Sequence, residues 1–273
     1  MAPSGDGSVP AIAADAHRRL EAIRAALTRE MEALLRRLDQ SNGRLISTRD
    51  ALANARRIRT QVLALMRQEG LPVIIGVAEA HVAEAVERSL ATSSAPRALA
   101  DAHRSVGITM DAEAKDSIAR SVSGVLDGVA DAFGAGQQAM RRAMDVGIST
   151  SAPLADLIAD VRAELDTTIA RAQTAVETAI RGAARVTLVT QAERGGKAAG
   201  EEMVYLWLGP VDSKTRPFCR EHVGKAYTLA ALKRMDNGQG LPVETFAGGM
   251  NCRHALSPLT IEDAESEGYA VVR

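Results

Sequence analysis

The residues whose types could do chemistry lie near the carboxyl end of this 273-residue chain. Both cysteines, Cys219 and Cys252, and two of the five histidines, His222 and His254, are found there. They form two pairs, Cys219-x-x-His222 and Cys252-x-His254. Two thiolates and two imidazoles are a suitable tetrahedral ligand set for zinc, and two ligands from each of two turns is the usual construction. The sequence therefore predicts a zinc site made of these four residues.

A structural role for zinc follows from the size of the segment that carries the pairs. Residues 197–273 are too few to bury enough apolar surface for comfortable stability, so a metal staple is expected. The second pair is tighter than usual, and Gly248 and Gly249 are expected to let the backbone turn sharply before it. Two alternatives stay open. The cysteines and histidines are ordinary core residues without a metal, or Cys219 and Cys252 form a disulfide after release from the cell.

Sequence motifs of common enzyme classes are missing. The chain has no H-E-x-x-H, no G-x-x-x-x-G-K-[ST] and no G-x-S-x-G, and it lacks the deaminase pattern. Asn251 and His254 have a spacing that suggests a His-Asn-His nuclease, but no histidine between His222 and His254 could act as general base. All four candidate ligands would be used by the metal, whereas catalysis needs an open position. We expect no catalytic residues, with a metal-dependent hydrolase on a helical carrier as the alternative.

The sequence before these residues is helical in character. Apolar residues recur every three or four positions, which is typical of amphipathic helices. Breaks are expected at Ser41-Asn42-Gly43, at the turn marked by Ser93, Ser94 and Pro96, and between Gly147 and Pro153. Helices are predicted over 11–40, from about 47 to 70, from 72 onward, across 118–133 and from 154 to beyond 180. Together they make a helical assembly or docking region over 11–190, an elongated bundle or set of packed hairpins.

A change of character after Gly195-Gly196 marks a second domain. Val204–Leu208 is rich in β-forming residues and Gly209-Pro210 follows it, so a short strand ending in a turn is predicted. The fold class is thus mainly α, with helices followed by a small α+β domain over 197–273. Long helices with few large side chains do not fill a wide core alone, so an oligomeric or partner-bound state is expected.

Charge and hydropathy limit the partners. The 33 basic and 34 acidic residues are balanced, which argues against a strong nucleic-acid footprint. No apolar stretch approaches the length of a membrane span. Residues 1–10 are small and polar, so a flexible terminus without the apolar core of a signal peptide is expected. Two cysteines without such a signal indicate synthesis in a reducing compartment.

The order of these features resembles a known family. Trp207, the segment Asp212-Ser213-Lys214-Thr215-Arg216, the motif Cys219-x-x-His222-x-Gly224 and the turn Asn251-Cys252-Arg253-His254 resemble the carboxy-terminal domain of phage head morphogenesis proteins. These are the minor head proteins similar to protein F of phage Mu. The helix Ala183–Glu193 is similar to the helix that precedes that domain. This chain has histidine where the family often has the second cysteine of each pair, and Gly248-Gly249-Met250 replaces a Pro-His-Pro-like lead-in.

The resemblance covers residues 183–260 and implies a structural role. Members of this family are present in few copies in the capsid, are associated with the portal, and act in head morphogenesis or DNA delivery. The chain is therefore expected to be a virion protein, made in the cytoplasm of a bacterial host, with portal or capsid proteins as partners. Besides the hydrolase, a coiled-coil signalling protein with a metal-sensing tip is a further alternative.

Overall fold

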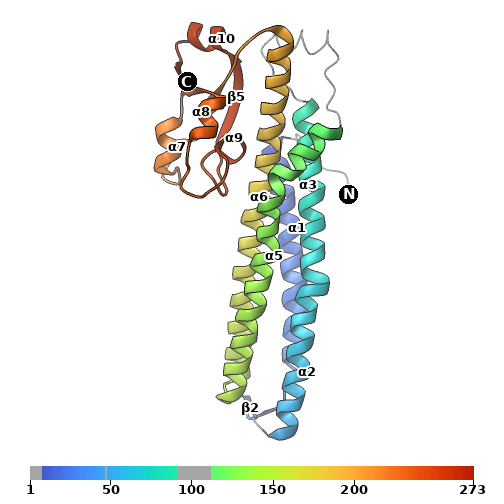
Figure 1. Cartoon of the computed structure of the whole chain (residues 1–273). Helices are drawn as coiled ribbons and strands as arrows, with labels where there is room; N and C mark the ends of the chain where they lie inside the picture. The colour runs from blue at the N-terminus through green and yellow to red at the C-terminus, as the bar shows by residue number, and fades with distance from the viewer. Residues whose placement is uncertain (1–7, 47, 92–111) are drawn as a thin grey trace. The chain divides into compact units, whose positions relative to one another are not determined.

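The computed structural model describes residues 8–46, 48–91 and 112–273 (Figure 1). Long helices make up most of this described part and a small sheet follows them, so the predicted mainly-α fold with a small α+β end is confirmed. The chain divides into two compact units, and each is described by itself. The first unit contains Met1–Ala13, His81–Gly124 and Glu177–Arg273, and the second contains Ala14–Ala80 and Val125–Val176.

The long helical elements agree with the apolar periodicity of the sequence. They are α1 (Val9–Leu35), α2 (Arg49–Leu65), the π-helical turn η1 (Met66–Gly70), α3 (Leu71–Ala91), α5 (Ala112–Ser149) and α6 (Leu154–Ala199). The predicted breaks at 41–43 and 147–153 are present. The turn expected at 93–96 and residues 1–7 of the expected flexible terminus lie outside the described residues, and α1 already begins at Val9.

Two local features differ from the sequence predictions. The break after α1 is a small hairpin, β1 (Gln40–Ser41) paired with β2 (Arg44–Leu45), in which Asn42 and Gly43 have φ angles of 51° and 74°. Asn-Gly suits such a two-residue turn because both residues tolerate positive φ. The helix expected to start at Pro72 is instead continuous with α2 through η1. A π-helical turn keeps the chain helical there while changing its hydrogen-bonding pattern.

The second unit is a helical bundle with close helix–helix contacts. A Cβ added to Gly70 of η1 would lie 3.0 Å from the Phe133 ring and 3.2 Å from Leu27. Gly136 of α5 faces Thr168 of α6 so closely that an added Cβ would lie 2.0 Å from the threonine hydroxyl. The glycines at these positions let the helices approach each other closely.

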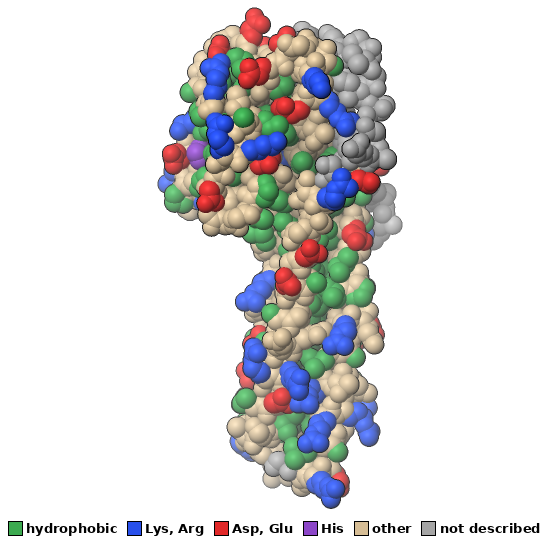
Figure 2. All heavy atoms as spheres, in the orientation of Figure 1, with side chains coloured by type: hydrophobic (Ala, Val, Ile, Leu, Met, Phe, Trp, Pro, Cys, Tyr) green, Lys and Arg blue, Asp and Glu red, His purple; other side chains and the backbone are tan. Residues whose placement is uncertain are grey.

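Charged side chains link the helices of the second unit at its surface. Arg24 of α1 donates to Asp166 of α6 at 2.9 Å, and Arg59 of α2 pairs with Asp145 of α5. On the face shown in Figure 2, basic and acidic side chains are interspersed. Throughout the described ranges, every helix is too short or too polar to cross a membrane.

The first unit combines the end of α6 with the small sheet. Its strands are β3 (Met203–Leu208), β4 (Lys225–Thr228), β5 (Ala255–Thr260) and β6 (Ala270–Val272), in the order β5-β3-β4-β6. β3 is antiparallel to β4 and β5, and β6 is parallel to β4. The predicted strand over 204–208 is therefore the centre of the sheet. Because Glu177–Ala199 of α6 belongs to this unit, the unit boundaries differ from the expected ranges 11–190 and 197–273.

Short helices connect the strands and cover the sheet. They are α7 (Pro217–His222), α8 (Leu229–Arg234), α9 (Val243–Phe246) and α10 (Ile261–Ser266). The main core of this unit contains Tyr205 and Trp207 of β3, Cys219 of α7, Cys252, and Val189 of α6. Three aromatic residues, Tyr205, Trp207 and Tyr227, are thus buried in one core together with both cysteines.

Candidate metal centre

Three of the four predicted ligands come together. Cys219, Cys252 and His254 are each at most 4% exposed, and their ligand atoms all lie within 4.8 Å of one another. Cys219 is presented by α7, whose first residue is Pro217, while Cys252 and His254 lie on the turn between α9 and β5. Residues 33 positions apart are therefore joined by the tertiary fold.

The distances between the donor atoms suit a tetrahedral ion. The two sulfurs are 3.7 Å apart, and the Cys252 sulfur is 3.6 Å from Nδ1 of His254. Zinc–sulfur bonds of about 2.3 Å and zinc–nitrogen bonds of about 2.05 Å place tetrahedral ligands about 3.8 Å (S–S) and about 3.6 Å (S–N) apart. The sulfur–sulfur distance is far beyond that of a disulfide bond, and neither cysteine is in a disulfide in this structure.

The second nitrogen of His254 has a defined role. Nε2 lies 3.1 Å from the carbonyl oxygen of Pro210. Since a carbonyl oxygen only accepts hydrogen bonds, Nε2 is the donor in this contact, and Nδ1 is the ring nitrogen that faces the Cys252 sulfur. Metal-bound histidines usually show this arrangement, in which a carbonyl or carboxylate holds the other ring nitrogen.

His222 lies outside this cluster. Its Nδ1 atom is 2.7 Å from the Tyr227 hydroxyl, and its ring packs at 4.5 Å from the Phe218 ring. The Trp207 ring lies near both histidines, with its centroid 5.4 Å from His222 and 6.4 Å from His254. Burial lowers the pKa of His222, which favours the neutral imidazole. His222 is therefore part of an aromatic group in this structure and is not the fourth donor.

Glycine and backbone geometry make room for the sulfurs. A Cβ added to Gly248 would lie 2.1 Å from the Cys219 sulfur, so no larger residue fits there without displacement. The amide of Gly248 donates to the Cys252 sulfur at 3.3 Å. Ala247, Gly249 and Asn251 adopt positive φ angles in the same turn. The sharp turn predicted from Gly248-Gly249 is present, and it extends over neighbouring non-glycine residues.

Arg185 of α6 anchors the turn that carries two of the donors. Its guanidinium donates to the carbonyl oxygens of Cys252 at 2.6 Å and His254 at 2.8 Å. The side chain is buried, and burial lowers its pKa to about 10, so it is still charged at neutral pH. Sequence reasoning missed this residue, although an arginine four positions before Val189 lies on the buried face of α6 and could have been noticed.

The charge of Arg185 favours a negative cluster. The hydrogen bond with Cys219, together with the nearby Arg185 charge, lowers the pKa of Cys252 and makes it the thiolate of the pair. The same hydrogen bond and burial raise the pKa of Cys219. A metal cation bound between the sulfurs would replace the proton that Cys219 holds and stabilise both thiolates.

The two segments that carry the family resemblance meet beside the cluster. Asp212 forms two hydrogen bonds with Arg253, at 2.6 and 2.8 Å, and accepts a further one from Thr215. The Arg253 guanidinium holds the pKa of Asp212 well below its usual range, with help from Thr215. Arg216 donates to the carbonyl oxygens of Gly248 and Met250. These contacts fix the loop before α7 against the turn before β5.

Comparison of the chain with protein-family models, with curated proteins and with solved structures gives no match. The geometry of the site itself therefore carries the functional conclusion. The cluster of Cys219, Cys252 and His254 could hold a metal ion with three protein ligands. The expectation that four ligands fill the coordination sphere, which was an argument against catalysis, depended on His222.

Proposed function

We propose that this chain is a structural protein of a phage particle, a minor head protein that acts in head morphogenesis or DNA delivery. One observation carries the proposal. The Asp212–Thr215 segment, Cys219 and the Cys252-Arg253-His254 turn, on which the resemblance depends, form one hydrogen-bonded structure around the buried cluster. Joint packing of separate motif segments is expected if they are parts of one domain type.

We further propose that zinc is bound by Cys219, Cys252 and His254 and acts as a structural staple. The donor set is soft, the distances suit tetrahedral coordination, and the three side chains are almost without solvent access. Binding would join α7 to the turn before β5. Since such binding contributes free energy only to the folded state, this unit would depend on the metal for stability.

The helical unit would be the part that docks on portal or capsid proteins. Its helices present extended surfaces with charged and small side chains, and it contains none of the three cluster residues. In this proposal the second unit makes the assembly contacts, and the first unit is stabilised by the metal. The chain would be located first in the cytoplasm of the bacterial host and then in the virion.

The particle assignment is tested by following the chain during phage production. A tagged chain is expressed from its own locus in the host, the phage is induced, and nuclease-treated particles are separated by density. The chain is expected in the particle fraction in low, fixed proportion to the major capsid protein, and cross-linked to the portal. Intact, infectious particles without the chain would overturn the assignment.

The metal assignment is tested by cobalt substitution in the purified chain. Tetrahedral cobalt with two thiolates gives strong sulfur-to-cobalt charge-transfer bands, and Cys252→Ser should weaken them and unfold the unit. His222→Gln is the matched control, because His222 lies outside the cluster and its replacement should leave the spectrum unchanged. A chain that binds no cobalt while remaining folded would contradict the zinc staple.

The number of protein donors favours a second candidate function. Three protein ligands leave one position of a tetrahedral ion open, which is the composition of catalytic zinc sites. A metal-dependent hydrolase is therefore the alternative. It requires that the bound cobalt exchange a water ligand with solvent and that a hydrolytic activity disappear on chelation. Burial of all three donors favours the structural role.

A further inference from the structure

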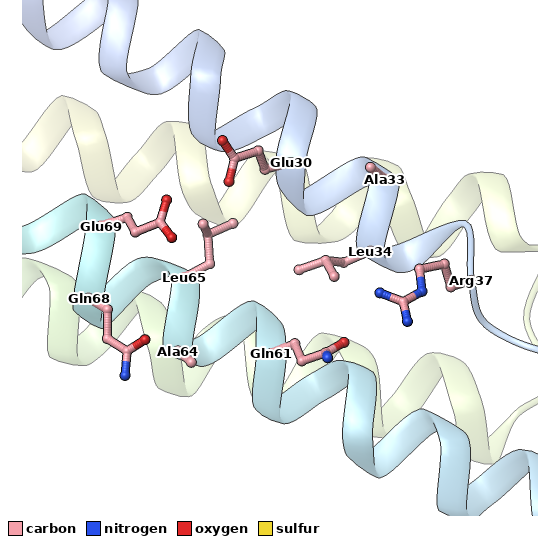
Figure 3. A pocket seen from close by; sticks show the side chains of 9 residues that line it. All are labelled: Glu30, Ala33, Leu34, Arg37, Gln61, Ala64, Leu65, Gln68 and Glu69. Carbon is pink, nitrogen blue, oxygen red and sulfur yellow. The ribbon is translucent and has the colours of Figure 1, made fainter.

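A groove runs between α1 and α2 in the second unit and continues along η1 (Figure 3). Its volume is about 450 Å³. Leu34 of α1 and Leu65 of α2 lie at its centre, and Ala33 and Ala64 lie beside them. The leucines and the neighbouring alanines make the centre of the groove apolar.

Charged residues of opposite sign stand at the two ends of this groove. Glu30 of α1 and Glu69 of η1 extend toward one another at one end, and Arg37, in the turn after α1, stands at the other (Figure 3). All three are exposed, and no ion pair is found for any of them in the described part of the chain. The two exposed carboxylates give this end of the groove a negative charge, which would attract a positive group of a partner.

The charges along the groove are arranged so that they match those of a second copy of the same groove in the opposite direction. Glu30 of α1 and Arg37, which lies in the turn after α1, are seven residues apart in sequence and stand at opposite ends of the groove (Figure 3). Leu34 lies about midway between them. A second α1 that runs in the opposite direction and crosses at Leu34 therefore brings each arginine to the acidic end of the other copy. The groove is complementary to itself under a two-fold rotation.

We propose that a second copy of this chain occupies the groove. The two copies pack α1 and α2 antiparallel about a two-fold axis at Leu34, with Arg37 of each facing Glu30 and Glu69 of the other. The apolar centres of the two grooves contact each other, and the charged residues determine the direction and register in which the two copies pack. This inference goes beyond the proposed function, since the dimer forms through the second unit without the metal cluster.

The test uses charge reversal in the full chain and analytical ultracentrifugation over the micromolar range. The wild-type chain is expected to form a dimer whose dissociation constant rises with salt concentration. Arg37→Glu makes all three groove charges negative, and the double variant Glu30→Arg with Glu69→Arg makes all three positive. For each variant alone, the dimer dissociation constant should be at least about tenfold higher than for the wild type, because like charges then face each other. An equimolar mixture of the two should form a heterodimer.

Arg36→Glu is the matched control, since Arg36 is adjacent in sequence but pairs with Glu32 and does not line the groove. It should dimerise like wild type. A cysteine introduced at Ala33, close to the axis, should form a disulfide-linked dimer under mild oxidation, whereas one at the exposed Ala53 should not. Cross-linking of these two cysteine variants tests the dimer even if a charge variant misfolds. A monomeric wild type, variants that dimerise normally, or equal cross-linking at both positions would overturn the proposal.

Discussion

Gly248 shows how one residue controls the cluster. Replacing it with alanine places a methyl group 2.1 Å from the present position of the Cys219 sulfur, so that sulfur must move. We expect Gly248→Ala to lose cobalt affinity by about tenfold or more, as disturbed metal sites do. Gly124→Ala is the control, because Gly124 lies on α5 without a positive φ and a Cβ there meets no atom within 4 Å. Unchanged cobalt spectra in Gly248→Ala would contradict the close approach.

Arg185 holds its unit together through backbone carbonyl groups. Arg185→Met removes the donors for the carbonyl oxygens of Cys252 and His254 and leaves both buried. A buried acceptor without a donor costs about 1–3 kcal/mol, so the free energy of unfolding should fall by at least about 2 kcal/mol. Arg185→Lys should recover only part of this loss, because lysine lacks the fork of donors. Urea unfolding followed by Trp207 fluorescence measures both variants.

His222 makes the stability of its unit dependent on pH. Burial lowers its pKa in the folded state below the ordinary value of 6.5. The unfolded chain therefore binds the proton first, and the stabilisation is complete above pH 6.5 and declines as the pH falls below it. The difference in unfolding free energy between wild type and His222→Gln should narrow between pH 7.5 and 5.5. A constant difference over this range would contradict the lowered pKa.

At the scale of elements, α5 packs on α6 through a position where only glycine fits. Gly136→Ala would bring a methyl group 2.0 Å from the Thr168 hydroxyl, and the two helices would have to separate. Overpacking of this kind costs about 1–3 kcal/mol. Gly134, two residues earlier on the same helix, meets no atom within 4 Å, so Gly134→Ala should stabilise the helix by about 1 kcal/mol. Chemical denaturation followed by far-ultraviolet circular dichroism measures the free energy of unfolding of both variants. Equal changes in the two variants would contradict this packing.

At the scale of the whole molecule, the two units should respond differently to metal removal. Trp207 is the only tryptophan and lies in the core of the first unit, so its fluorescence reports on that unit alone. With the staple removed by a chelator, the fluorescence transition should move to lower temperature by several degrees. Circular dichroism, which reports on all helices, should keep a second transition at its original temperature. A common shift of both signals would indicate that the chain unfolds as one unit.

The sequence by itself determined the helices, the strand around Trp207 and the glycine-dependent turn. These depend on local periodicity, β-forming side chains and turn residues, which act over a few positions. It also identified Cys219, Cys252 and His254, because rare residue types in pairs are visible without a fold. Continuity of α2, η1 and α3 was not visible, since Pro72 usually marks a helix start.

Only the tertiary structure decided which of the four predicted ligands meet. Cys219 and His222 are three residues apart, yet the His222 ring packs against Trp207 and its Nδ1 contacts the Tyr227 hydroxyl instead of joining the cluster. Arg185, 67 residues before Cys252, reaches the turn because α6 packs against it. Side-chain direction and contacts between distant segments follow from packing of the whole unit, and local spacing does not contain that information.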